Sequence, residues 1–497
     1  MRTQLTFTIG AGQDTTQEKI FAVSQGCNQI YFSYDLVLPF TMVTFVMVKD
    51  PSGNVRFLKQ MGYSKHKCAI GHGAHDTTIG GVPGEIPAGN WTFRISIFAE
   101  YADMLKTPTD FHVNVSDEGK EDISEAEVVQ GSIWTCGKFQ YGQYDFKEMK
   151  TPEQRWYRGD LHTHTRLSDG KETPESASRK AENMGLDFYA PTEHNVLHTG
   201  WPNTEVLILP GVEITTCLGH ANLFGVNRIP STLENILGNR DKEELKEDIL
   251  RTQDECKEEG WLFSVNHPFL YTWKWLMRDL PLSKVDCLEI CNDPTYAAVD
   301  VAKAREANKK TVMLSDLLWE DGHRICAIGG SDSHNTVHEF YPGAEEPSIP
   351  GDPSTWLYMN GLSVNNSLNA MRCCYSYVTR HCKITSNLLF GSQLTNSEQE
   401  IMYVLQLSGQ AKKPDIFYYY NGEKIPCDVN WIREETWEIR GSISLKQEEY
   451  QWIRFGAEDA EGNFLFYANP ITKGRKDCVL NTYGEAIDEL ENRMPGH

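Results

Sequence analysis

The pattern of apolar and polar positions divides the chain into three parts. Apolar and polar residues alternate at 5–9, 30–34 and 91–97, as is typical of strands with one buried face. Turn-forming clusters such as 50–54 separate these runs, and no long segment before about residue 115 has a helical period. This part is predicted to be a β-sandwich.

From residue 156 the pattern changes to strands that alternate with helices, which is typical of a βα architecture. Thr173 and Pro174 predict the start of a helix that Gly185 ends. A second helix is predicted over 241–259, a third over 299–308 and a short one over 367–374. Strands are predicted at 157–162, 186–191, 206–210, 220–224, 261–265, 286–290 and 325–328.

Strand patterning returns from about residue 395 to 473, with a hairpin turn at Asn421 and Gly422. We therefore predict a sandwich over 1–130, a linker over 131–155, a central α/β domain over 156–394 and a second sandwich over 395–475. The pattern predicts no structure for the tail, 476–497. The C-terminal aromatic residues suit core packing, or alternatively a sugar-binding face.

The ends of the central strands carry the candidate chemistry. His162 and His164 stand where the first strand ends, and residues two apart on a strand point to the same side. Such strand ends are where barrel enzymes build their sites. Six histidines and three carboxylates stand at successive strand ends or in the loops that follow: His162, His164, Asp169, His194, Glu213, His220, His267, Asp332 and His334.

Imidazole and carboxylate ligands together suit Zn²⁺, Mn²⁺ or Fe and not Ca²⁺. Nine ligands are too many for one ion, and a carboxylate such as Glu213 can bridge two ions. The alternative is that these side chains are packed separately, but nine of them at successive strand ends favour a metal centre. We predict two or three divalent ions.

Other polar residues near these ligands are candidates for contact with a substrate. Arg166, Lys171, Asn195 and Asn266 lie beside the ligands, and a cation there could hold a phosphate oxygen. Support of the ligands, or a plain surface charge, is the alternative. Catalytic roles are assigned to Glu213, Asp332 and His198, with His323 as another possible general acid and His338 as a rim residue. Asp316, Glu320 and Asp321 are interpreted as surface charges.

Charge and composition restrict the partners of the protein. The 497 residues carry a formal net charge of −22, which argues against a nucleic acid or an anionic membrane as the main partner. The 13 cysteines show no paired spacing, and neither a signal peptide nor a membrane-length apolar run is present. We expect reduced thiols and a cytoplasmic location.

Four short motifs carry a resemblance to a known family. Residues 160–164 with Asp169, 192–195, 266–268 and 331–334 resemble the four signatures of the PHP (polymerase and histidinol phosphatase) superfamily. The resemblance covers about 155–340 and implies a distorted TIM-like (β/α)7 barrel in which all nine residues bind metal. Many relatives carry Asp where this chain has Glu193. The order of domains is similar to the CehA/McbA-like branch.

The expected function is that of a metal-dependent hydrolase. Metal ions lower the pKa of a bound water, and the hydroxide attacks phosphorus or a carbonyl carbon. The resemblance implies a phosphoesterase that acts on a small, phosphorylated molecule. The alternatives are a carboxyl ester, carbamate or amide substrate, or a non-catalytic glycan-binding protein with an inert barrel. The Pro/Gly-rich stretch 341–353 is either a loop over the site or a plain connector.

Overall fold

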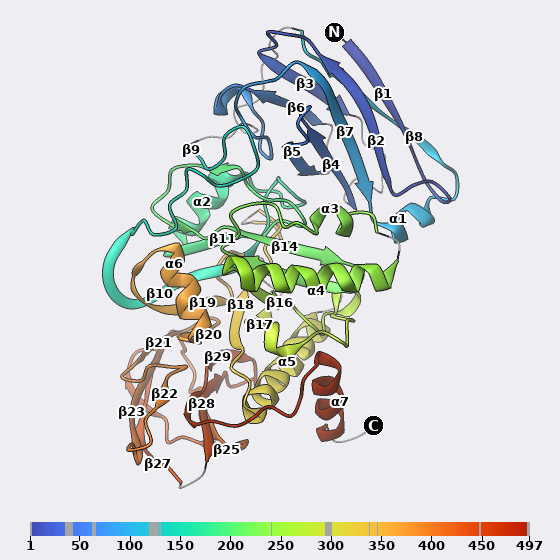
Figure 1. Cartoon of the computed structure of the whole chain (residues 1–497). Coiled ribbons are helices and arrows are strands. Elements are labelled where there is room, and N and C mark those ends of the chain that lie inside the picture. Colours follow the sequence, from blue (N-terminus) through green and yellow to red (C-terminus); the bar gives the residue numbers. More distant parts are fainter. Residues whose placement is uncertain are drawn as a thin grey trace.

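The structure is a computed structural model that describes residues 2–34, 43–61, 66–118, 128, 131–239, 241–293, 301–336, 338–344, 346–446 and 449–494. It is a mixed α/β structure with many strands and few helices (Figure 1). Among the helices of these ranges, none has the length and apolar character that a membrane span requires.

The N-terminal part consists of two four-stranded antiparallel sheets that share one core. Phe32 of the first sheet lies 4.8 Å from Phe57 and 5.4 Å from Phe93 of the second, measured between ring centroids. The first sheet has the order β1 (Arg2–Ile9), β8 (Thr109–Ser116), β3 (Gln29–Tyr34), β6 (His66–Gly71). The second has the order β2 (Thr16–Val23), β7 (Gly89–Ile97), β4 (Thr44–Lys49), β5 (Val55–Gln60), and α1 (Ala99–Met104) follows β7.

These sheets pack directly on the central part of the chain. Leu58 of β5 is fully buried in the same apolar cluster as many central residues. The neighbouring Gln60 donates its backbone N–H to the carbonyl of Leu167 (3.3 Å), and the Lys59 ammonium donates to the carbonyl of Arg166. The N-terminal sheets therefore support the loop that follows His164.

The central strands belong to two sheets. The larger sheet runs on into the C-terminal part, in the order β13 (Leu207–Ile208), β11 (Phe188–Pro191), β10 (Thr151–Thr163), β19 (Ser354–Leu362), β20 (Ser376–Thr379), β29 (Phe464–Ala468), β28 (Tyr450–Glu458), β24 (Asp415–Tyr420), β25 (Glu423–Pro426). In the same sheet, β30 (Ile471–Gly474) pairs with β28 and with β22 (Gln393–Leu394). The second sheet has the order β14 (Gly211–Thr216), β15 (Gly219–Phe224), β16 (Leu262–Val265), β17 (Cys287–Asn292), β18 (Cys326–Gly330).

Two short bridges join the ends of β10 and β11 to the two edges of the second sheet and thereby position the candidate site. One bridge pairs Thr163, at the end of β10, with Ser333 after β18. The other pairs His194, after β11, with Glu213 in β14. Because β10 and β11 are parallel, as are β16, β17 and β18, their carboxyl ends meet on one side.

The helices begin where capping residues predict. Thr173 accepts the Ser176 N–H at the start of α2 (Pro174–Asn183), and Asp241 caps α4 (Lys242–Glu259), which ends at Gly260 with φ 74°. Ser363 caps α6 (Val364–Arg372), so this helix starts three residues before its predicted start. The remaining central helices are α3 (Leu233–Ile236) and α5 (Val301–Asp321), which is far longer than the predicted 299–308; residues 299 and 300 lie outside the described ranges.

The stretch predicted as a linker packs against the central core. Its strand β9 (Ser132–Ile133) pairs with β12 (Gly200–Trp201), and the Trp134 and Tyr141 rings are buried 5.2 Å apart. The C-terminal part adds a separate sheet, in the order β21 (Lys383–Ser386), β23 (Glu400–Ser408), β27 (Thr436–Ser444), β26 (Asn430–Arg433).

The tail forms a helix that the apolar pattern did not predict, α7 (Tyr483–Arg493), which begins with a capping box of Thr482 and Glu485. Asp321 anchors the approach to it by accepting the backbone N–H groups of Val479 and Leu480. Asp321 is thus buried, and its prediction as a surface charge is wrong.

Candidate metal centre

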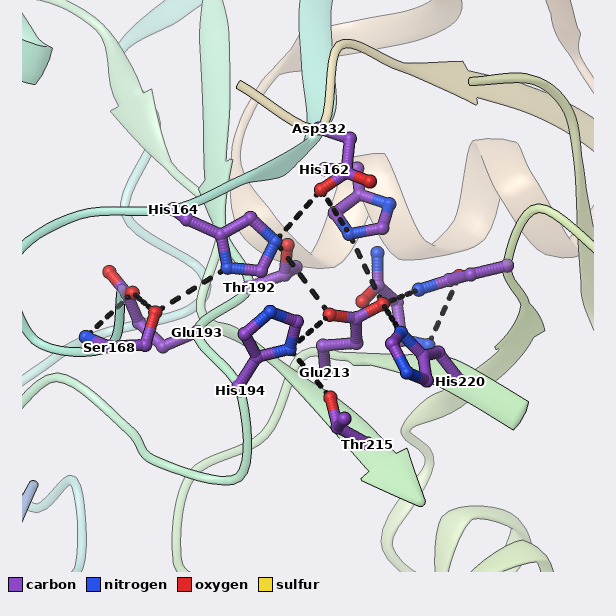
Figure 2. A network of polar contacts seen from close by, with 12 residues as sticks. His162, His164, Ser168, Thr192, Glu193, His194, Glu213, Thr215, His220 and Asp332 are labelled. Carbon is purple, nitrogen blue, oxygen red and sulfur yellow. Dashed lines mark hydrogen bonds and ion pairs between the residues drawn. The ribbon is translucent and has the colours of Figure 1, made fainter. Parts of the chain in front are cut away.

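The structure brings all nine predicted ligands to one place. Figure 2 labels six of them: His162, His164, His194, Glu213, His220 and Asp332. The two sheets contribute the nine ligands from neighbouring strand ends, because the bridges described above hold β10 and β11 beside β18 and β14. The contributing positions are β10 and the loop after it (His162, His164, Asp169), the turn after β11 (His194), β14 and β15 (Glu213, His220), the turn after β16 (His267) and the turn after β18 (Asp332, His334).

Glu213 lies at the centre of the cluster and is fully buried. Five histidine rings approach its carboxylate. Oxygen Oε1 lies 3.3 Å from His162 Nε2, 3.2 Å from His220 Nδ1 and 3.4 Å from His267 Nε2. Oxygen Oε2 lies 2.7 Å from His194 Nδ1 and 3.7 Å from His164 Nε2. A carboxylate with different neighbours on its two oxygens is placed to bridge two cations.

The two aspartates lie at the edge of the cluster, on the side of His334. Asp332 Oδ1 lies 3.0 Å from His164 Nε2 and 3.3 Å from His162 Nε2. Asp169 Oδ1 lies 3.3 Å from His334 Nε2 and 3.6 Å from His194 Nε2. The backbone of Asp332 is held at φ 50°, a conformation that non-glycine residues adopt rarely and that is enriched at functional sites.

The donor set fits divalent cations. Six buried atoms at the cluster form no hydrogen bond within the described part of the chain: His162 Nε2, His164 Nε2, Asp169 Oδ1, Glu213 Oε2, His267 Nδ1 and Asp332 Oδ1. A buried polar atom that forms no hydrogen bond needs another stabilising interaction, so six such atoms in one cluster require an explanation. Sets of three or four of these residues offer ligand atoms within 4.8 Å of one another, as an ion requires.

Charge within the cluster shifts the ionisation of its members. Burial lowers the pKa of His164 to about 4, and the neighbouring His334 and His194 add to this effect, so its imidazole is neutral at pH 7. Burial opposes protonation of His334 as well, but Asp169 and Asp332 raise its pKa to about 10. Burial likewise disfavours the charged form of Glu213, yet the surrounding histidines hold its pKa well below the usual range.

Sequence reasoning missed Glu289, a buried carboxylate of β17. Its Oε1 lies 2.9 Å from His162 Nδ1, and its Oε2 accepts the backbone N–H of His267 at 2.9 Å. This contact directs the other ring nitrogen of His162 toward the cluster. The available signal was a second charged residue, after Asp286, within the predicted strand 286–290.

Glu193, which directly precedes His194 in the sequence, lies behind the ligands. It accepts the Thr165 N–H at 3.0 Å and contacts His198 Nε2 at 2.8 Å. Burial disfavours its charged form, but His198 and His164 lower the pKa of Glu193 to about 2. Glu193 therefore fixes the loop after His164.

Most of the predicted substrate residues lie outside the cavity that borders the cluster. Arg166 is exposed and donates from Nε to the carbonyl of Lys171 (2.9 Å). Asn195 pairs with the backbone of Thr215, and Asn266 donates to Glu213 Oε1 at 2.9 Å. Both asparagines therefore support ligands.

The histidines predicted as general acids or rim residues also lie outside this cavity. His198 is buried against Glu193 and does not line the cavity, so a direct role as general acid does not fit its position. His323 bonds to the carbonyl of Leu480, while His338 is exposed and does not line the cavity.

The cavity itself has a volume of about 290 Å³. Lys171 lines it and forms an ion pair with Glu339, which also lines it. Asp293 adds a further carboxyl group to the wall. The opposite wall is apolar and comes from the loops after β16 and β18: Leu270, Trp273, Phe340, Tyr341 and Pro342. The first residues of the Pro/Gly-rich stretch therefore border the site.

No protein-family model matches the sequence, and no curated protein matches it. Among solved structures, a two-domain protein from Bacteroides vulgatus that contains a predicted PHP-like metal-dependent phosphoesterase is 17% identical, with 66% of this chain and 100% of that chain covered and a TM-score of 0.35. A candidate metal-dependent phosphoesterase from Bifidobacterium adolescentis is 15% identical (43% and 95% covered, TM-score 0.24). An amidohydrolase from Chromobacterium violaceum with bound sulfate and no metal is 14% identical (44% and 97% covered, TM-score 0.22). Similarity at this level does not establish a shared fold or activity.

Proposed function

We propose that the protein is a metal-dependent hydrolase, with a phosphoester of a small molecule as its first candidate substrate. The observation that supports this most is the convergence of six buried ligand atoms that lack hydrogen bonds. A packed, inert core would not gather so many imidazole nitrogens and carboxylate oxygens at ion-pair distance without hydrogen-bond geometry.

The nine residues would hold two or three divalent ions, Zn²⁺, Mn²⁺ or Fe²⁺. Glu213 would bridge two of them, with His162, His267 and His220 near one oxygen and His164 and His194 near the other. Asp169 and His334 would hold an ion at the opposite side. When bound, such ions polarise the substrate and lower the pKa of water.

The side chains around the ligands have supporting roles. Asn266 orients Glu213, and Glu289 holds His162 and the backbone of His267. Lys171 is the cavity residue placed to contact an anionic group of the substrate. Trp273 and Phe340 would hold its organic part. The volume of about 290 Å³ suits a small molecule and not a polymer.

A carboxyl ester, carbamate or amide is the second candidate substrate. Lys171 is the one lysine or arginine among the described residues that line the cavity, and it already forms an ion pair with Glu339. A neutral substrate would not need a further cation. The pairing of Lys171 with Glu339 therefore favours a neutral carbonyl substrate.

The proposal extends to the fold of the central part. We propose a distorted seven-stranded barrel of PHP type built from β10, β11 and β14 to β18, with a β-sandwich domain on each side and the domain limits predicted from the sequence. The two bridges that join the sheets at Thr163 and His194 support closure of such a ring. The order of domains supports the CehA/McbA-like branch.

The test is a substrate screen of the purified protein loaded with Mn²⁺, Zn²⁺ or Fe²⁺. Phosphomonoesters, phosphodiesters and carboxyl esters are compared before and after removal of metal by a chelator. We expect hydrolysis of at least one activated phosphoester, abolished by the chelator. Equal turnover with and without metal, or no turnover by protein that demonstrably contains metal, would contradict the proposal.

A further inference from the structure

A second cavity, of about 260 Å³, lies between α5 and the C-terminal strands and shares no lining residue with the candidate metal centre. One wall is a single face of α5, since its residues recur at helical spacing. These residues are Arg305, Asn308, Lys309, Val312, Met313 and Asp316. The ion pair of Asp316 with Arg454 of β28 holds the helix against the sheet.

The opposite wall is aromatic and rigid. Phe417 and Tyr419 of β24 and Phe464, Phe466 and Tyr467 of β29 line it. The buried Arg454 guanidinium stacks 4.4 Å from the Tyr419 ring centroid and 4.5 Å from that of Tyr467. Its Nε and second terminal nitrogen bond both oxygens of Asp316, at 2.9 and 2.5 Å. The Phe417 and Tyr419 rings are perpendicular (84°), so this wall offers aromatic faces and edges to a ligand.

The charges of the lining do not cancel. Both carboxylates are already paired, Asp316 with Arg454 and Glu458 with Lys424 (3.6 Å). Arg305 and Lys309, on the other hand, form no ion pair within the described part of the chain, although Arg305 is close enough to lower the pKa of Asp459, which does not line the cavity. In a protein with a net charge of −22, two cations without an ion pair beside an aromatic wall favour an anionic ligand.

We propose that this cavity is a binding site for a small organic anion with a flat apolar body, such as an aromatic carboxylate. The carboxylate would be held by Arg305 and Lys309, and the ring would lie against the aromatic wall. The volume accommodates a compact ligand and excludes a peptide or a glycan chain. The proposal is independent of the hydrolase function, because it concerns another cavity and binding alone.

The experiment is calorimetric titration of the full-length, metal-loaded protein with benzoate and with acetate. Benzoate should bind saturably, and acetate, which lacks the ring, at least about tenfold more weakly. Arg305→Glu and Lys309→Glu should each weaken benzoate binding by about tenfold or more. Lys303→Glu reverses an exposed charge on the same helix that does not line the cavity, and it should change affinity by less than about twofold.

A second variant separates the ring from the charge. Phe464→Ala, at a partly buried position, should weaken benzoate binding and leave acetate binding unchanged. Thermal unfolding of each variant verifies that it is folded. Absence of saturable benzoate binding would overturn the proposal. Benzoate binding that survives both charge reversals unchanged would overturn it as well, because the anion would then occupy the metal centre or another surface.

Discussion

Replacement of Glu213 by Gln is the most direct test of a multinuclear centre. The substitution keeps the size of the side chain but removes the negative charge that five histidines surround. Two unit charges about 4 Å apart interact by about 4 kcal/mol at an effective dielectric constant of 20. The amide oxygen remains a weak neutral ligand, so we take half of this value, about 2 kcal/mol, as the loss for each bridged ion.

A loss of about 2 kcal/mol weakens the binding of one ion by about 30-fold, and of two ions together by about 10³-fold. At limiting metal, kcat/KM should therefore fall by about 10³-fold in Glu213→Gln. Metal content is measured by elemental analysis after dialysis against a metal buffer. Wild-type protein should hold two or three equivalents, and the variant fewer than one.

The matched control is Glu255→Gln, which changes a buried glutamate of α4 that pairs with Arg228 and accepts the Ser231 N–H. This variant should keep its metal and its activity, although it should lose some stability. Full metal content and full activity in Glu213→Gln would refute a centre bridged by this carboxylate, as would saturation of the wild type at one equivalent.

Three further predictions concern protons, support and packing. His162 and His334 have raised pKa values and carry protons at pH 7 without metal. Metal binding should therefore release protons, and metal affinity should fall as pH falls. Titration in two buffers of different ionisation enthalpy counts the released protons, and a count of zero would contradict this charge distribution. Glu289→Gln should lower metal affinity by about 10–100-fold in a chelator competition, and unchanged affinity would show that this carboxylate does not orient His162. Leu58→Ala should lower the free energy of unfolding in urea by about 2–5 kcal/mol, whereas Ile20→Ala, at a position that is 67% exposed, should lower it much less. Equal effects would mean that the N-terminal sheets are not integrated with the central core.

The grouping of the ligands could be predicted from the sequence because each ligand adjoins a recognisable strand. The apolar run before His267 and the one before Asp332 both end at the polar residues that matter. Parallel strands bring such ends together whatever the details of packing. The helix caps at Thr173 and Asp241 were predictable for a similar reason, since capping depends on residues adjacent in sequence.

What could not be predicted depends on contacts between distant residues. The larger sheet continues from β20 into β29 through the pairing of Tyr377 with Ala468, which no local pattern indicates. The side chain of Arg166 turns back to the carbonyl of Lys171, a consequence of the conformation of one loop. The burial of Asp321 depends on a tail whose helix could be recognised only from its capping box.

The two candidate substrates depend differently on the charges around the cavity. Asp293 and Glu339 line it beside the ligands, and Lys171 is the single lysine or arginine among the described lining residues. A phosphoester would need Lys171 to offset these carboxylates, whereas a neutral ester would not. Lys171→Gln should therefore lower kcat/KM for a phosphomonoester by about tenfold, through KM, and leave that for a carboxyl ester within about twofold.

Arg179→Gln is the control for this comparison, because Arg179 is an exposed cation that pairs with Glu175 and does not line the cavity. It should change neither substrate by more than about twofold. Glu339→Gln removes the ion-pair partner of Lys171 and frees its ammonium group. This variant should therefore shift the preference in the opposite direction, toward the phosphoester. Equal losses for both substrates in Lys171→Gln would mean that this ion pair shapes the loop and does not contact the anion, and the preference for a phosphoester would then have to come from the metal ions alone.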